Sequence, residues 1–183
     1  MQEKLLLGVA REIITPKIGC ELCGYGTGFF SDSVADDLTA TAFYFEQGET
    51  KALMVSLTVC SISTTLSDDI RAQIATRFNV PESNTMLCCI HTHTGPCTSA
   101  TPGWGDVDRE YCDEIFVPRI LCAVERATQN VQSVSVGIAF GDSFVGINRR
   151  ELNFENQIVL GQNPWGSFDK RMTVIAFKDE NGK

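Results

Sequence analysis

Apolar and polar residues follow two different periods along the chain, and these periods predict both strands and helices. Short, β-favouring apolar runs predict strands over residues 5–14, 40–45, 52–59, 85–90, 131–140 and 171–177. The second and third runs flank Gln47-Gly48-Glu49-Thr50, which predicts a hairpin. The run 85–90 is almost wholly apolar, so we expect that strand to be buried on both faces.

Two segments have the three- and four-residue spacing of a helix. In residues 64–78, Ser67-Asp68-Asp69 supplies the acidic first turn that a helix prefers. Residues 107–127 predict the longest helix, and Pro118 inside it should kink or split it. Hairpins combined with strand–helix–strand units predict an α/β fold, in which a mixed sheet with hairpins is flanked by helices.

The length of 183 residues suits one domain with a single core. The last residues, Asp179-Glu180-Asn181-Gly182, have the composition of a hairpin turn, yet no outgoing strand follows. We therefore expect residues 1–183 to be a single domain or a fragment, an incomplete N-terminal portion of a larger catalytic domain. In that case the strand at 171–177 lacks a partner here, and we expect a discrete homo-oligomer.

The charge of the chain limits its partners. A net charge of -8 repels phosphate backbones, so we expect no nucleic acid partner. No apolar run is long enough to cross a bilayer. The first eleven residues do not resemble an export signal, which predicts a cytoplasmic protein with reduced thiols.

The chain has eight cysteines, and two of them, Cys20 and Cys23, form a C-x-x-C pair. Such a pair can bind a metal or cycle as a dithiol. A zinc site of this kind needs a second pair at similar spacing, which the other cysteines do not supply. We interpret the pair first as structural thiols, then as a metal site, and last as a redox pair.

The chain has two histidines, in the sequence His91-Thr92-His93 directly after the apolar run 85–90. If that strand continues, its period of two places both imidazoles on one face at the strand end, where functional sites gather. Imidazole is the commonest protein ligand for zinc, and catalytic zinc sites keep one position open. We favour a metal or catalytic site over two surface histidines on a loop.

The loop over residues 17–37 is rich in glycine, with Gly19, Gly24, Gly26 and Gly28. Glycine lets a backbone come close to a ligand because it has no Cβ. An ordinary surface connection explains the composition equally well.

His91-Thr92-His93-Thr94-Gly95-Pro96 resembles the H-T-H-[ST]-G-P signature of neutral and alkaline non-lysosomal ceramidases. Three weaker segments agree in order. Residues 8–16 resemble the opening strand of the family, with Glu12 where aspartate is usual. Residues 22–26 resemble its G-Y loop, and residues 146–150 resemble its N-R motif. The resemblance spans nearly the whole chain and corresponds to the N-terminal part of the catalytic domain.

This resemblance implies a zinc-dependent hydrolase of a linear amide, with an N-acyl, ceramide-like substrate and water activated by the metal. His91 matches a zinc ligand, and His93 matches a catalytic histidine beside the metal. Gly24 and Tyr25 match substrate-binding positions, and Arg149 matches a catalytic arginine that could stabilise the oxyanion. The remaining zinc ligands, a histidine, a glutamate and a tyrosine, are expected beyond residue 183.

Two alternatives remain open. The chain could be a non-catalytic family member that binds a small molecule or lipid, or a cysteine-based redox or metal module on Cys20 and Cys23. One matched ligand and one neighbour cannot saturate a tetrahedral ion, so residues 1–183 alone are predicted to bind zinc weakly.

Overall fold

The structure is a computed structural model that describes residues 4–182. Residues 1–3, the first part of the N-terminal segment tested above for an export signal, lie outside the described residues, as does residue 183. The chain divides into two compact units, Met1–Val134 and Ser135–Lys183. Each unit is described by itself, and the assignment of residues 1–183 to one domain stays a prediction.

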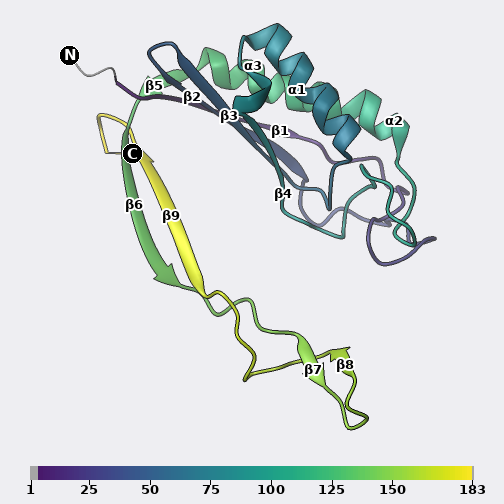
Figure 1. The fold of residues 1–183 in the computed structure, drawn as a ribbon. Helices are drawn as coiled ribbons and strands as arrows, with labels where there is room; N and C mark the ends of the chain where they lie inside the picture. Colours follow the sequence, from purple (N-terminus) through teal and green to yellow (C-terminus); the bar gives the residue numbers. More distant parts are fainter. Residues whose placement is uncertain (1–3, 183) are drawn as a thin grey trace. The chain divides into compact units, whose positions relative to one another are not determined.

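Unit 1 contains a five-stranded mixed sheet, which confirms the predicted fold class (Figure 1). Its strands lie in the order β4-β3-β2-β1-β5. Only the β3–β4 pair is parallel, and the other neighbours are antiparallel. The bounds are β1 (Leu6–Ile13), β2 (Thr39–Gln47), β3 (Thr50–Leu57), β4 (Thr85–Cys89) and β5 (Val131–Ser133).

The helices of unit 1 lie on one face of this sheet (Figure 1). Helix α1 (Thr64–Phe78) matches the predicted bounds, but Ser63 caps it and its first turn holds no acidic residue. Ser67 is buried inside the helix, so the expectation that Ser67-Asp68-Asp69 supplies its acidic first turn was wrong. A short 3-10 turn, η1 (Glu82–Asn84), leads from α1 into β4.

Pro118 disrupts the second helical segment as predicted. That segment comprises α2 (Arg109–Tyr111), a π-helical stretch η2 (Cys112–Phe116) and α3 (Val117–Gln129). Because proline has no backbone N–H, the ladder widens just before it, and Pro118 then takes a place in the first turn of α3. Between the helices and the sheet lies a core of fully buried apolar side chains, among them Val55, Leu57, Ile70, Ile74, Phe116 and Ile120.

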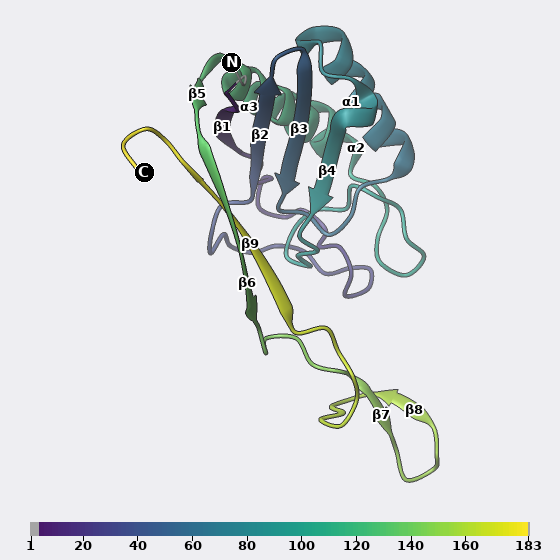
Figure 2. The ribbon, with the colours of Figure 1, turned by 60° about the vertical axis from the view of Figure 1, so that its left-hand side comes forward.

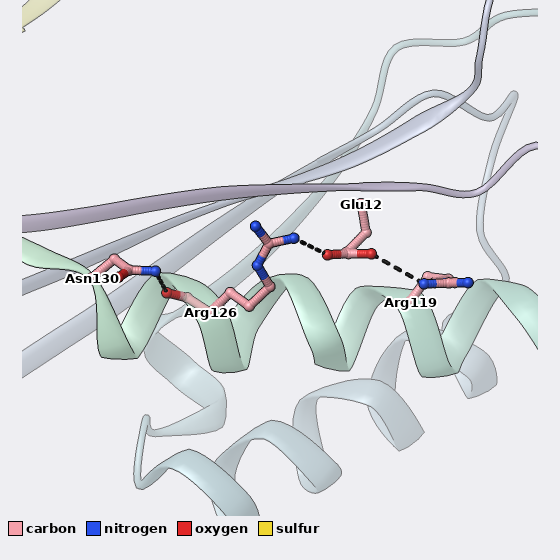
Figure 3. Close-up of polar contacts among 4 residues, drawn as sticks. All are labelled: Glu12, Arg119, Arg126 and Asn130. Atoms are coloured by element: carbon pink, nitrogen blue, oxygen red, sulfur yellow. Dashed lines mark hydrogen bonds and ion pairs between the residues drawn. The ribbon is translucent and has the colours of Figure 1, made fainter.

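Glu12 is a buried acidic residue on the helix-covered face of β1 (Figure 3). Arg126 donates a hydrogen bond to its Oε1, and Arg119 Nη1 lies 3.2 Å from its Oε2. The hydrogen bond from Arg126 lowers the pKa of Glu12, while burial acts in the opposite direction. Asn130 donates to the backbone carbonyl of Arg126 at 2.8 Å. Glu12 therefore ties β1 to α3.

Strand β4 differs from its prediction. It pairs only with β3, so it is an edge strand of this sheet, and most of its residues are half-buried. Met86 is 51% exposed. An apolar run alone does not separate a central strand from an edge strand, because partner number is a tertiary property.

Unit 2 is built from two-stranded sheets (Figure 2). The predicted strand 131–140 is split, because its first part belongs to unit 1 as β5 and the rest forms β6 (Ser135–Asp142). Strand β9 (Arg171–Lys178) pairs with β6 over its full length, so the expectation that it lacks a partner was wrong. A smaller pair joins β7 (Arg150–Leu152) to β8 (Ile158–Leu160). Among the described residues, no helix has the length and apolar character needed to span a membrane.

Candidate metal centre

The connection after β4 carries both histidines. Strands β3 and β4 run parallel, so both strands end on the same side of the sheet, and the segments that follow them leave the sheet there (Figure 2). Hydrogen bonding continues beyond β4, from Ile90 N to Leu57 O and from His91 N to Val59 O, both at 3.1 Å. This pairing brings Cys60, after β3, against His91, after β4.

The two imidazoles meet, although the strand does not continue through them. His91 has φ of 66°, in the left-handed region that non-glycine residues seldom adopt. Such backbone strain collects at functional sites. His91 Nε2 lies 3.3 Å from His93 Nε2. The predicted proximity is confirmed, but a local bend of the backbone produces it rather than the pleat of a strand.

A backbone carbonyl sets the orientation of His91. Its Nδ1 lies 2.9 Å from the carbonyl oxygen of Cys60, an atom that can only accept, so Nδ1 carries the hydrogen. Nε2 then presents its lone pair toward His93. Metal-binding histidines usually donate their second ring N–H to a group of this kind, which fixes the tautomer.

The glycine-rich loop packs against the histidine pair. A Cβ at Gly24 would lie 2.6 Å from Cε1 of His93 and 2.8 Å from its Cγ, so only glycine fits beside this ring. The ring of Tyr25 meets that of His93 edge to face at 5.1 Å between centroids. The structure thus brings Gly24, Tyr25, His91 and His93 together.

Trp104 also packs against the two histidine rings, and the sequence analysis did not identify it as a site residue. Its ring centroid lies 5.3 Å from that of His93 and 6.0 Å from that of His91. The carbonyl of Trp104 accepts hydrogen bonds from Gly24 N at 3.2 Å and from the Cys97 thiol at 3.3 Å. Trp104 is separated from the histidines by a loop without regular spacing, so no periodic signal could have identified it.

Three buried thiols, those of Cys23, Cys60 and Cys97, form a cluster next to the histidines. Burial raises the pKa of Cys23 and of Cys60 to about 11, and it also raises that of Cys97. Cys20 lies outside this cluster, with its Sγ 3.4 Å from Ser31 Oγ. The two cysteines of the C-x-x-C pair therefore have different partners, which gives the dithiol alternative no geometric support.

Arg149 belongs to unit 2, immediately before β7. Its carbonyl accepts a hydrogen bond from Gly161 N at 2.9 Å, and the residue lines an open cavity of about 560 Å³. The predicted catalytic role of Arg149 stays a prediction, because the site described above lies within unit 1.

A second cavity, of about 580 Å³, adjoins the histidine segment. Thr92 and Thr94 line it, together with Thr58 and the acidic residues Asp36 and Asp37. Neither His91 nor His93 is among the residues that line this cavity.

The donors at the strand ends fit a transition metal. Cys60, His91 and His93 can each offer a ligand atom, and these atoms lie within 4.8 Å of one another. Two nitrogen ligands of a tetrahedral zinc ion, each about 2.0–2.1 Å from the metal, stand roughly 3.3–3.4 Å apart. The Nε2–Nε2 separation of 3.3 Å therefore suits two ligands of one ion.

The fold and the strand-end site define a mixed α/β protein of the ceramidase fold. Over 100% of its length, the chain matches the crystal structure of neutral ceramidase from Pseudomonas aeruginosa, with a TM-score of 0.80 and 20% sequence identity. It also matches, over 99% of its length, a structure described as ceramidase complexed with C2, with a TM-score of 0.76 and 21% identity. The resemblance predicted from the sequence is thus confirmed at the level of the fold.

The match covers only part of each solved chain. This chain spans 31% of the first and 30% of the second, so it corresponds to about a third of a ceramidase. No family model matches the sequence, and no curated protein matches it. Identities of 20% and 21% establish a shared fold and leave activity to be tested.

Proposed function

We propose that this chain is part of a zinc-dependent hydrolase of linear amides, with an N-acyl, lipid-like molecule as substrate. The observation that carries the proposal is the convergence of His91 Nε2 and His93 Nε2 at 3.3 Å, on a fold shared with ceramidase. The sequence motif His91-Thr92-His93 and the ceramidase fold of the chain both support this proposal.

The proposal gives each residue of the site a role. His91, with Nδ1 held by the Cys60 carbonyl, offers Nε2 as a metal ligand. His93 stands beside it, where it can hold or transfer a proton at Nε2 or bind the ion itself. Tyr25, which is 64% exposed, offers an apolar ring edge to a substrate. A zinc ion bound here would supply Lewis acidity at the amide carbonyl.

Further ligands are required. Catalytic zinc sites have about three protein ligands and one open position. The proposal places the remaining histidine, glutamate and tyrosine ligands outside residues 1–183. It also keeps Arg149 as a candidate for stabilising the oxyanion.

The test is hydrolysis of N-acyl amides of graded acyl length by the protein expressed from its complete gene. We expect activity that a chelator abolishes and zinc restores. His91→Ala should abolish both activity and bound zinc. His93→Ala should lower kcat more than it lowers zinc content.

Equal zinc loss in the two variants would show that both histidines are ligands. If the complete protein binds N-acyl amides but does not hydrolyse them with zinc bound, the hydrolase proposal fails. The non-catalytic binder would then describe the protein.

A further inference from the structure

Trp104 contacts both imidazoles of the site and has no role in the function proposed above. Its ring centroid lies 5.3 Å from that of His93 and 6.0 Å from that of His91, with interplanar angles of 55° and 49°. Both separations fall within the range in which aromatic rings attract one another. One side chain thus touches the two groups whose convergence carries the proposed function.

The indole of Trp104 is itself held in place. It is half-buried and packs against the buried thiol cluster. The carbonyl of Trp104 accepts a hydrogen bond from the Cys97 thiol at 3.3 Å, and its N–H donates to the carbonyl of Thr101 at 2.9 Å. The next residue, Gly105, has φ of 108°, and a Cβ there would lie 2.7 Å from the Cys97 sulfur. The backbone around Trp104 therefore fixes where the indole stands.

The two histidines differ in what orients their rings. A backbone carbonyl accepts from His91 Nδ1, whereas no hydrogen bond joins the His93 ring to the backbone among the described residues. The torsion that turns an imidazole about its Cβ–Cγ bond is broad and does not by itself select one orientation. The orientation of His93 therefore depends on packing, which Gly24, Tyr25 and Trp104 supply.

We propose that Trp104 is a positioning residue, whose aromatic ring holds the imidazoles of His91 and His93 in their converged arrangement. The inference rests on the proposed function only in giving His93 a task in turnover. Misplacement of a reacting group by about 1 Å can lower a rate about 100-fold. Loss of the indole should therefore slow turnover, although Trp104 is given no contact with substrate or ion.

Proton NMR of the 183-residue chain tests the positioning without metal or substrate. Because the two Nε2 atoms lie 3.3 Å apart, hydrogens on the neighbouring ring carbons should give a nuclear Overhauser cross-peak between His91 and His93. Trp104→Leu, which keeps an apolar side chain but no ring, should abolish this cross-peak. Trp104→Phe should retain it, because a ring still stands beside both imidazoles.

Trp165→Leu is the matched control. Trp165 is the other tryptophan of the chain, is 94% exposed and belongs to unit 2, so this variant should leave the cross-peak unchanged. Urea denaturation of each variant separates a loss of position from a loss of stability.

The complete protein gives the corresponding kinetic result. At saturating zinc, Trp104→Leu should lower kcat for N-acyl amides by about 10- to 100-fold, the scale on which groups that orient the residues of a metal site act. KM should stay unchanged, and Trp104→Phe should restore most of the lost kcat.

Trp104→Met replaces Trp104→Leu if the leucine variant does not fold, because methionine fills irregular apolar space without a ring. A cross-peak that persists in the variant without a ring overturns the proposal, as does its absence from the folded, unmodified chain. Equal loss in Trp104→Phe and Trp104→Leu overturns it as well, since the aromatic ring would then not be what holds the histidines.

The two proposals fail separately. A chelator-sensitive amidase whose Trp104→Leu variant keeps both the cross-peak and kcat refutes only the positioning role. Loss of the cross-peak in Trp104→Leu, together with a complete protein that hydrolyses no N-acyl amide, upholds the positioning and refutes only the function.

Discussion

Substitution of Gly24 by alanine should displace the His93 ring. Gly24 has φ of 101°, and its added Cβ would lie 2.6 Å from Cε1 of His93. Carbon atoms pack at about 3.5–4.0 Å, so the ring must retreat by roughly 1 Å. Overpacking of this kind costs about 1–3 kcal/mol, in addition to about 1–2 kcal/mol for a side chain at positive φ.

Gly19→Ala separates these two contributions. Gly19 has φ of 93°, yet nothing lies within 4 Å of its added Cβ. Gly19→Ala should therefore lower the free energy of unfolding only by the backbone contribution of about 1–2 kcal/mol, whereas Gly24→Ala should lower it by about 2–5 kcal/mol in total. The difference between the variants measures the contact with His93.

Urea denaturation gives both stabilities, and proton NMR reports on the histidines. The chain has only two histidines, so their ring signals can be assigned by His91→Ala and His93→Ala. Gly24→Ala should shift the His93 signal, and Gly19→Ala should leave it in place. Equal destabilisation by the two variants with an unchanged His93 signal would refute the packing of the loop against this ring.

Three further outcomes are expected. Glu12→Gln should lower stability by about 1–3 kcal/mol at neutral pH, while Glu125→Gln, an exposed change on α3, should be neutral in the same urea titration. Because the pKa of Glu12 is lowered in the folded protein, the stabilisation that its carboxylate provides is present above the unfolded pKa of about 4.3 and is lost as the pH falls through the folded pKa. If the stability of Glu12→Gln and of the wild type fell in parallel in an acid titration, this reasoning would be contradicted. Asn79→Ala should destabilise α1 by about 1 kcal/mol in thermal unfolding, whereas Asn79→Gly should not, since Asn79 ends the helix at φ of 54°. In the complete protein, Tyr25→Ala should raise KM for N-acyl amides with little change in kcat, and Tyr25→Phe should behave like the wild type. A decrease in kcat without a change in KM would show that Tyr25 does not bind the substrate.

Elements fixed by local pattern were predictable from the sequence. Helix α1 has the predicted bounds, since its apolar spacing and its end at Asn79-Val80-Pro81 are local signals. The hairpin of β2 and β3 was equally clear from its turn sequence. Whether a strand lies at an edge depends on distant partners, so β4 was wrongly expected to be buried on both faces. The break between β5 and β6 has the same cause, because Val134 N bonds to Leu5 O, a partner 129 residues earlier by subtraction of these numbers.

The candidate site was predicted in part. The motif and the resemblance identified His91, His93, Gly24 and Tyr25, and the structure brings these four together. Cys60 was not predicted as a neighbour of the histidines, because a thiol at the end of an apolar run has no distinctive spacing. It reaches His91 only through the parallel pairing of β3 with β4.

Backbone hydrogen bonds explain why these groups meet with defined geometry. The pairing of His91 N with Val59 O leaves the next carbonyl, that of Cys60, free to accept from His91 Nδ1. The glycine-rich loop is held by a bond from Cys23 N to Gly95 O at 2.9 Å, which sets Gly24 against His93. Main-chain groups thus select the tautomer of one histidine and confine the ring of the other. Because every residue except proline has both a backbone N–H and a carbonyl, the sequence does not distinguish this arrangement from others until the register of the sheet is known.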